Sequence, residues 1–206
     1  YKIDLRVRTI DALELPARLE MKVENKAAEP FIKLHTDARR IRIESINVDG
    51  EIASFETLNG IAGPFNLTGD VLKVSSDKFL DLRKLHNVQL VYTIQVNHPE
   101  ATTDGVTVQE GFFYEPNYNG DAVLSTRNWP YYARMWLPSN DHPEDGAKFD
   151  FILHVPSDVK AVANGYLTSG NLVDGSYVDE NGQKVYQWRQ DTPIPTYASN
   201  IVIANL

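Results

Sequence analysis

Apolar and polar side chains alternate over much of the chain, and this period of two residues places successive side chains on opposite faces of a β-sheet. The clearest example is the segment 88–96, where every second residue from Val88 to Val96 is apolar. The same pattern recurs at 3–7, 19–23 and 149–155. Each segment is typical of a strand with one face on a core and the other face in water. The sequence therefore predicts an all-β fold.

Turn residues support the same fold class. Eight of the 12 glycines follow Asn or Asp, pairs that suit tight hairpin turns. Asp49-Gly50, for example, lies between the apolar runs 41–48 and 52–55 and predicts a hairpin. Only 77–85 has helical spacing, with Ser76 as a cap, and a single helical turn or an ordered loop fits it equally well. Short strands at turn-marked intervals predict a mostly antiparallel sandwich or curved sheet with little helix, forming one domain over 1–206.

Composition excludes several classes of function. The chain has 20 Lys and Arg against 28 Asp and Glu, a net charge of −8, which argues against a nucleic-acid partner. It has no cysteine, so it can form neither a disulfide nor a thiolate site. No apolar run approaches the roughly 18–20 residues of a membrane-spanning helix. The sequence predicts a domain that does not span a membrane.

Catalytic motifs are missing from the sequence. The five histidines (His35, His86, His98, His142 and His154) form no HExxH zinc motif, and the chain has no GxSxG, GxxxxGK[ST] or GxGxxG. His35 and Asp37 share one face of an expected strand, and we expect a solvated polar face there rather than a metal. His154 is expected at the surface, and the calcium-loop-like segment 174–182 is expected to be an exposed hairpin. The residues alone indicate an all-β module with no catalytic apparatus of its own.

Aromatic side chains and prolines crowd into the stretch 110–143, which breaks the alternation. The aromatic residues are Phe112, Phe113, Tyr114, Tyr118, Trp129, Tyr131, Tyr132 and Trp136. Such a stretch can form a binding surface, pack under loops, or join a neighbouring domain.

The segment ARMWLPSNDHP at 133–143 resembles the A-R-x-x-F-P-C-x-D-E-P stretch of the aminopeptidase N / leukotriene hydrolase family of zinc metallopeptidases. The next segment, AKFDFILHVP at 147–156, is similar to the family's K-A-x-F-x-[IV]-x-[IL]-x-x-P. The segments 43–50, 162–165 and 192–204 also resemble family stretches, and all of these matches occur in the family's order.

The resemblance implies the saddle-shaped β domain that precedes the catalytic domain, built from a large curved sheet with smaller sheets packed upon it. We expect the chain to be a fragment, with the HExxH…E zinc domain beginning just beyond Leu206. The implied parent enzyme removes amino-terminal residues from peptides. Its zinc would belong to the catalytic domain and none to this chain, whose partners would be that domain in cis and the peptide substrate.

In the family, a Glu or Gln of this domain helps to hold the free α-amine of the substrate. Counting back from Pro138 places that position at Trp129, which cannot supply a carboxylate but could offer a cation–π contact. The alternatives are Asn128 as a neutral acceptor, Glu115 from the preceding loop, or no anchor at all, with Trp129 packed in the core.

The remaining residues of the family-like segment are expected to be structural. They are Arg134, Trp136, Pro138, Asp141 and Pro143, and His142 is not expected to be a ligand. The resemblance thus implies a non-catalytic domain that docks on a catalytic domain through an apolar, aromatic-rich patch at 112–136. The alternative is a self-contained β-sandwich that binds carbohydrate or protein through the same aromatic residues, and a hydrolase with a carboxylate pair ranks third.

Overall fold

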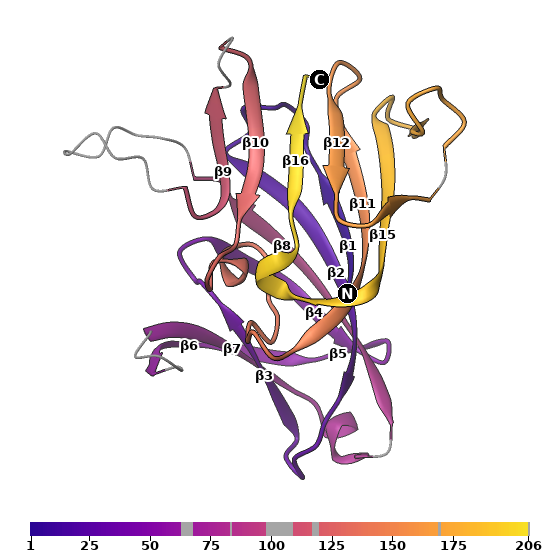
Figure 1. Ribbon diagram of the computed structural model, residues 1–206. Coiled ribbons are helices and arrows are strands. Elements are labelled where there is room, and N and C mark those ends of the chain that lie inside the picture. The colour runs from indigo at the N-terminus through magenta and orange to yellow at the C-terminus, as the bar shows by residue number, and fades with distance from the viewer. Residues whose placement is uncertain (63–67, 83, 98–108, 117–119, 169, 206) are drawn as a thin grey trace, which may run out of the picture.

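Three β-sheets make up the computed structural model, which describes residues 1–62, 68–82, 84–97, 109–116, 120–168 and 170–205 (Figure 1). The largest sheet has nine strands, eight of them in the spatial order β13 (Tyr166–Leu167), β15 (Lys184–Pro195), β11 (Gly146–Val155), β1 (Lys2–Arg6), β2 (Glu14–Glu24), β8 (Leu85–Gln95), β4 (Ile41–Val48) and β5 (Glu51–Ile52). The ninth, β14 (Tyr177–Val178), pairs with β15. All these pairings are antiparallel except that of β1 with β11.

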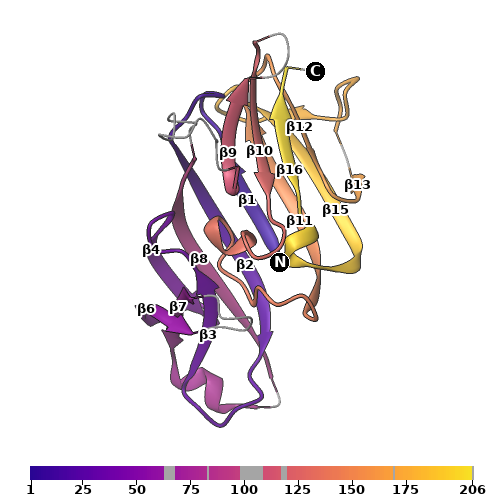
Figure 2. The ribbon, with the colours of Figure 1, turned by 60° about the vertical axis from the view of Figure 1, so that its left-hand side comes forward.

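Two smaller sheets cover one face of the large sheet (Figure 2). One has the order β12 (Lys160–Ala163), β16 (Ile201–Ala204), β10 (Ala122–Arg127) and β9 (Gly111–Pro116). The other has the order β3 (Phe31–Thr36), β7 (Thr68–Ser75) and β6 (Ser54–Ala62). Side chains from all three sheets form one apolar cluster, with Leu5 from the large sheet, Ile203 from the four-stranded sheet and Leu72 from the three-stranded sheet all fully buried.

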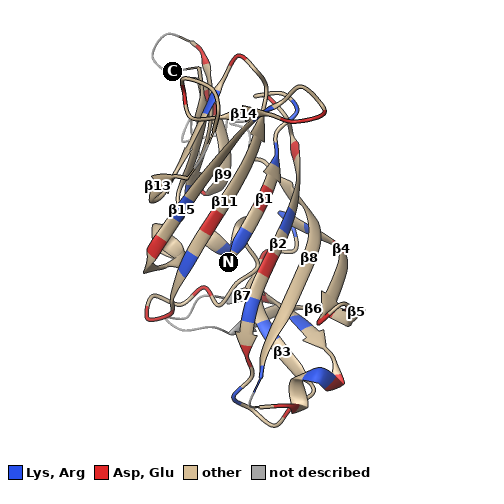
Figure 3. Ribbon diagram, turned by 90° about the vertical axis from the view of Figure 1, so that its right-hand side faces the viewer, with Lys and Arg blue, Asp and Glu red and all other residues tan. Residues whose placement is uncertain are grey.

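The opposite face of the large sheet is charged (Figure 3). Lys2 lies between Asp150 on β11 and Glu20 on β2 in the strand register. Asp150 in turn pairs with Arg189 on β15, whose Nε lies 2.7 Å from its carboxylate. Opposite charges on adjacent strands favour the pairing and keep this face wet. The main apolar cluster of the domain therefore lies on the side of the two small sheets.

These observations confirm the predicted all-β fold and the large sheet with smaller sheets packed upon it. The alternating segments form β1, β2, β8 and β11. Asp49 and Gly50 both have positive φ, 51° and 86°, as a two-residue hairpin turn requires. The possible helix after Ser76 is a single turn, the 3-10 helix η2 (Asp77–Leu80), with the Ser76 hydroxyl accepting a hydrogen bond from the Lys78 N–H. No helix among the described residues has the length and apolar character needed to cross a membrane.

His154 is buried, so its expected place at the surface is wrong. Its Nδ1 lies 2.8 Å from the Asp179 carboxylate and its Nε2 lies 3.4 Å from Asp4. Two carboxylates from distant parts of the chain thus converge on the imidazole and compensate for its burial. His98, another histidine of the sequence, lies outside the described residues.

Candidate functional site

A buried ion pair organises the connection between β10 and β11, which contains the 3-10 helix η3 (Ala133–Met135). Arg134 Nε lies 2.9 Å from Asp141 Oδ2, and Arg134 Nη2 donates to the Asp141 carbonyl oxygen at 3.1 Å. The second carboxylate oxygen of Asp141 accepts a hydrogen bond from the Thr196 hydroxyl at 2.6 Å. Thr196 begins the 3-10 helix η4 (Thr196–Ala198), so the pair ties this connection to the segment that leads into β16.

Asn128 holds the same two segments together from the end of β10. Its side chain is 2% exposed; Oδ1 accepts from Trp136 Nε1 at 2.8 Å and Nδ2 donates to the Ser199 carbonyl oxygen. Trp136 is fully buried, with its ring edge-on to Phe112 at 5.7 Å between centroids. The amide of Asn128 is therefore engaged within the fold, beneath the surface.

The last residues of the family-like segment also lie in or next to the interior. Pro138 is buried and Pro143 is half-buried. His142 Nδ1 accepts a hydrogen bond from the Glu144 N–H at 3.3 Å. Together with Arg134 and Asp141, these residues shape the chain between β10 and β11.

His35 on β3 joins this network, in contrast to the solvated face expected for it. Its backbone pairs with Ser139, and its Nδ1 accepts a hydrogen bond from the Asp141 N–H at 3.0 Å. An accepting Nδ1 requires the neutral imidazole. Burial, followed by the positive charge of Arg134, lowers the pKa of His35 below its usual 6.5.

The lowered pKa of His35 predicts that acid destabilises the domain. The unfolded chain takes up this proton at a higher pH than the folded chain, so the free energy of unfolding should fall as the pH drops through 6.5. The slope should stay below ~1.4 kcal/mol per pH unit, the limit for one proton. We expect His35→Asn, which retains an acceptor near the Nδ1 position, to show a smaller fall between pH 7.5 and 5.5 in urea unfolding. An identical fall in both proteins would contradict this role of His35.

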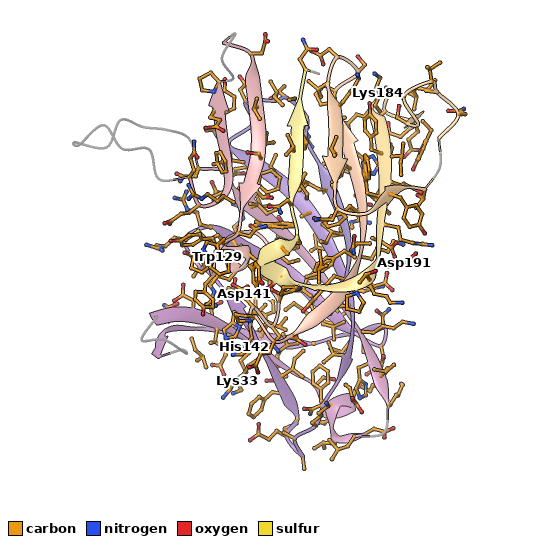
Figure 4. All side chains as sticks on the ribbon, viewed as in Figure 1. Lys33, Trp129, Asp141, His142, Lys184 and Asp191 are labelled. Carbon is orange, nitrogen blue, oxygen red and sulfur yellow. The ribbon has the colours of Figure 1, made fainter. Side chains whose placement is uncertain are left out.

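Trp129 is exposed at the start of the turn that Asn128 anchors. Its side chain is 63% accessible, so the expectation that it packs in the core is wrong. Its ring meets that of Tyr197 in η4 edge to face, at 5.1 Å between centroids and an interplanar angle of 80°. Figure 4 shows Trp129 and Asp141 beside the turn that leads into β16. The position that the family resemblance assigns to a substrate contact is thus at the surface.

Glu115 lies far from Trp129. Along the paired strands β9 and β10, Glu115 is opposite Val123, whereas Arg127, two residues before Trp129, is opposite Gly111 at the other end. The Glu115 carboxylate accepts a hydrogen bond from Gln109. The structure therefore brings Asn128 and Trp129 together as chain neighbours but does not bring Glu115 to them.

The outer face of the four-stranded sheet is less charged than the outer face of the large sheet. Val162 on β12 and Val202 on β16 are cross-strand partners and remain 40% and 36% exposed. Val202 is in turn opposite Ser125 on β10, which is opposite Phe113 on β9. Ala161, Ile203 and Leu124 on the opposite side of the same strands are buried in the core. This face thus exposes a pair of valines at the edge of the sheet, whereas Ser125 and Phe113 in the same row are buried.

The aromatic stretch supplies only part of the apolar patch expected of it. Phe112, Phe113 and Trp136 are buried, and Tyr131 and Tyr132 are half-buried. Among the described aromatic residues of 112–136, Trp129 alone is largely exposed. Tyr118 lies outside the described residues. One exposed indole among the described residues of this stretch does not make the flat aromatic platform that a carbohydrate-binding module would need.

A cavity of about 550 Å³ lies between the three-stranded sheet and the turn 130–135. Asp37 on its wall is paired with Arg39 at 2.7 Å. Asp70 accepts hydrogen bonds from the backbone N–H groups of Ala38 at 2.8 Å and Gly60 at 3.3 Å. Both carboxylates are thus engaged in shaping the loops around the cavity.

Metal ligands do not gather anywhere in the described part of the chain. No group of three or more His, Asp or Glu side chains there could hold an ion. In the segment 174–182, Asp174 accepts hydrogen bonds from Ser176, Tyr186 and Lys184. Val178 pairs with Lys184 across β14 and β15, and Asn181 and Gly182 between these strands are exposed, so the expected exposed hairpin is present.

Sequence reasoning missed three members of this site: His35, Thr196 and Ser199. Thr196 and Tyr197 lie within a family-like segment, but the spacing of residues does not indicate that Thr196 contacts Asp141 or that Tyr197 contacts Trp129. Thr196 and Asp141 are 55 residues apart in the sequence, and His35 and Asp141 are 106 residues apart.

Comparison with protein families matches residues 1–198 to the peptidase M1 N-terminal domain. Among solved structures, an M1 zinc metallopeptidase from Deinococcus radiodurans has a TM-score of 0.73 and 23% identity, over 98% of this chain and 40% of that chain. Native leukotriene A4 hydrolase from Saccharomyces cerevisiae has a TM-score of 0.68 and 14% identity, over 98% of this chain and 28% of that chain. At these identities the likeness to the solved structures is one of fold, and this chain spans less than half the length of either. A search of curated proteins by sequence gives no significant match.

Proposed function

The chain belongs to the peptidase M1 N-terminal domain family, and we propose that it serves as the non-catalytic amino-terminal domain of a zinc-dependent aminopeptidase. The observation that carries this proposal is the match over residues 1–198 together with the exposed Trp129 at the position where the family contacts substrate. A related structure from Deinococcus radiodurans is described as bound to a Tyr-Ser-Ala substrate, which supports a peptide as the substrate class.

In this proposal the zinc belongs to a catalytic domain in cis. The described residues of this chain do not form a metal site, so the metal chemistry is assigned wholly to that domain. This chain contributes a wall of the substrate cleft at Trp129. The network of Asn128, Arg134 and Asp141 beneath Trp129 keeps that wall in place, because each of these side chains is buried and hydrogen-bonded.

The catalytic domain would dock on the outer face of the four-stranded sheet. Two observations favour this face over the outer face of the large sheet. It exposes the Val162–Val202 pair, whereas the large sheet exposes a ladder of charges that includes the Asp150–Arg189 ion pair. The turn η4, which precedes β16, also places Tyr197 and Trp129 at one end of the four-stranded sheet. A domain seated there would meet both the Val162–Val202 pair and Trp129.

The docking face can be tested with Val202→Lys in the full-length protein. An unpaired ammonium buried in an apolar interface is strongly unfavourable, so we expect kcat/KM for an aminoacyl-anilide to fall at least about tenfold, equivalent to ~1.4 kcal/mol. The matched control is Val178→Lys, because Val178 is also exposed but lies on β14 in the large sheet. The control should remain within about twofold of the wild type.

In this chain alone, Val202→Lys should unfold at nearly the same urea concentration as the wild type, because the residue is already partly exposed. Equal activity of the two lysine variants in the full-length protein would place the docking face elsewhere.

A further inference from the structure

The end of β3 meets the connection between β10 and β11 through three hydrogen bonds centred on His35. The His35 N–H donates to the Ser139 carbonyl oxygen at 2.8 Å, and the Ser139 N–H donates to the His35 carbonyl oxygen at 3.2 Å. The Asp141 N–H donates to His35 Nδ1 at 3.0 Å. We call these three hydrogen bonds the His35 clasp, and they join a strand of the three-stranded sheet to the connection.

The His35 clasp lies beside the cavity of about 550 Å³. Thr36, the residue after His35, and Arg134 in the connection both line this cavity. Arg134 Nη1 also approaches β7 closely, since a Cβ added at Gly69 would lie 3.0 Å from it. Close-packed side chains resist displacement, whereas a segment that borders a cavity has room to move. The end of β3 therefore has space to separate from the connection.

Positive charge near His35 makes the clasp sensitive to acid. Burial, followed by the charges of Arg134 and of a protonated His142, lowers the pKa of His35, and the Asp141 carboxylate opposes this effect. Val71, opposite His35 on β7, is uncharged. A protonated imidazole carries an N–H at Nδ1, so it can no longer accept a hydrogen bond from the Asp141 N–H. Protonation thus removes one bond of the clasp and places a second cation near Arg134.

We propose that the His35 clasp is an acid-sensitive junction, in which protonation of His35 separates the end of β3 from Ser139 and Asp141 while the rest of the domain stays folded. The opening is local because β3 remains paired with β7 along Phe31–Thr36, and Leu34 and Leu72 remain in the apolar cluster. The clasp contributes while the ring is neutral, and its contribution is lost as the pH falls. This inference does not depend on the proposed function, because it concerns the folded chain alone.

Amide hydrogen exchange of the purified chain, measured by NMR and corrected for the intrinsic pH dependence of exchange, tests the proposal. Protection of the Ser139 and Asp141 amides should fall about tenfold between pH 7.5 and 5.5, because one proton is linked to the opening. In His35→Asn, which retains an acceptor and does not titrate in this range, protection should change less than about twofold. The matched control is His142→Asn, which leaves His35 in place and should retain most of the fall.

Urea separates local opening from unfolding of the whole domain. A local opening exposes little surface, so about 1 M urea should leave the protection of the Ser139 and Asp141 amides unchanged. The same urea should lower the protection of the amides of β8, which lies between β2 and β4 in the centre of the large sheet. The clasp amides should also be less protected than those of β8 at pH 5.5.

Three results would overturn the proposal. The first is clasp amides with the same protection and the same urea dependence as those of β8, because they would then exchange only through global unfolding. The second is protection that does not change with pH, and the third is an equal fall in the wild type and in His35→Asn. If His35→Asn does not fold, NMR of the histidine rings in the wild type decides instead. The pH at which His35 takes up its proton must then match the pH at which the clasp amides lose protection, and a mismatch would overturn the proposal.

Discussion

Replacing Asp141 with alanine should lower the free energy of unfolding by about 3–5 kcal/mol, because it leaves the buried Arg134 guanidinium without its partner. The Asp141 side chain is 1% exposed and that of Arg134 is 10% exposed, so water compensates little. The same change removes the acceptor of the Thr196 hydroxyl and so loosens the turn η4. Urea unfolding followed by circular dichroism, with an unchanged m-value, measures the loss.

Two controls show whether the loss comes from the uncompensated charge. Asp150→Ala removes the carboxylate of an exposed pair with Arg189, at a similar 2.7 Å, and should cost less than about 1 kcal/mol. Arg134→Met combined with Asp141→Leu removes both charges and should recover part of the stability lost in Asp141→Ala. If Asp141→Ala lowers the free energy of unfolding no more than Asp150→Ala does, the Arg134–Asp141 ion pair does not organise the connection between β10 and β11.

The strands could be predicted because their signal is local. Alternation along 88–96 depends only on which side chains face the core, and the hairpin at Asp49-Gly50 depends only on backbone freedom at two residues. The core side chains of β8 and β11 follow directly from the same alternation. The presence of smaller sheets packed on the large sheet came from the family resemblance instead, because no local pattern specifies it.

The polar interior could not be predicted in the same way. The alternation put His154 on the polar side of its strand, where a surface position was expected, but Asp4 and Asp179 converge on it from β1 and from the turn after β14. His35 was expected on a solvated face, yet it accepts a hydrogen bond from Asp141, 106 residues away. Burial of a polar side chain depends on hydrogen-bonding partners that only the folded chain brings close. The spacing of residues along the sequence does not identify those partners.

Trp129 illustrates the opposite case. An apolar aromatic residue is usually buried, and hydropathy alone favours the core for it. The structure exposes it because the neighbouring Asn128 turns inward and bonds to Trp136 and Ser199. The burial of Asn128 thus accounts for the exposure of its neighbour Trp129.

Catalytic activity shows the largest expected difference between this chain and the full-length protein. In the proposed function, the roughly three protein ligands that a catalytic zinc site needs belong to a catalytic domain in cis. We therefore expect the 206-residue chain to give no turnover above buffer, with or without added zinc. The full-length protein with zinc should exceed the uncatalysed rate by about a millionfold or more, as enzymes generally do.

One measurement tests this account most directly: hydrolysis of an aminoacyl-anilide by the purified chain and by the full-length protein, each with and without zinc. The account predicts release of the anilide product only from the zinc-loaded full-length protein. Turnover by the purified chain itself, or an inert full-length protein that binds zinc, would contradict it.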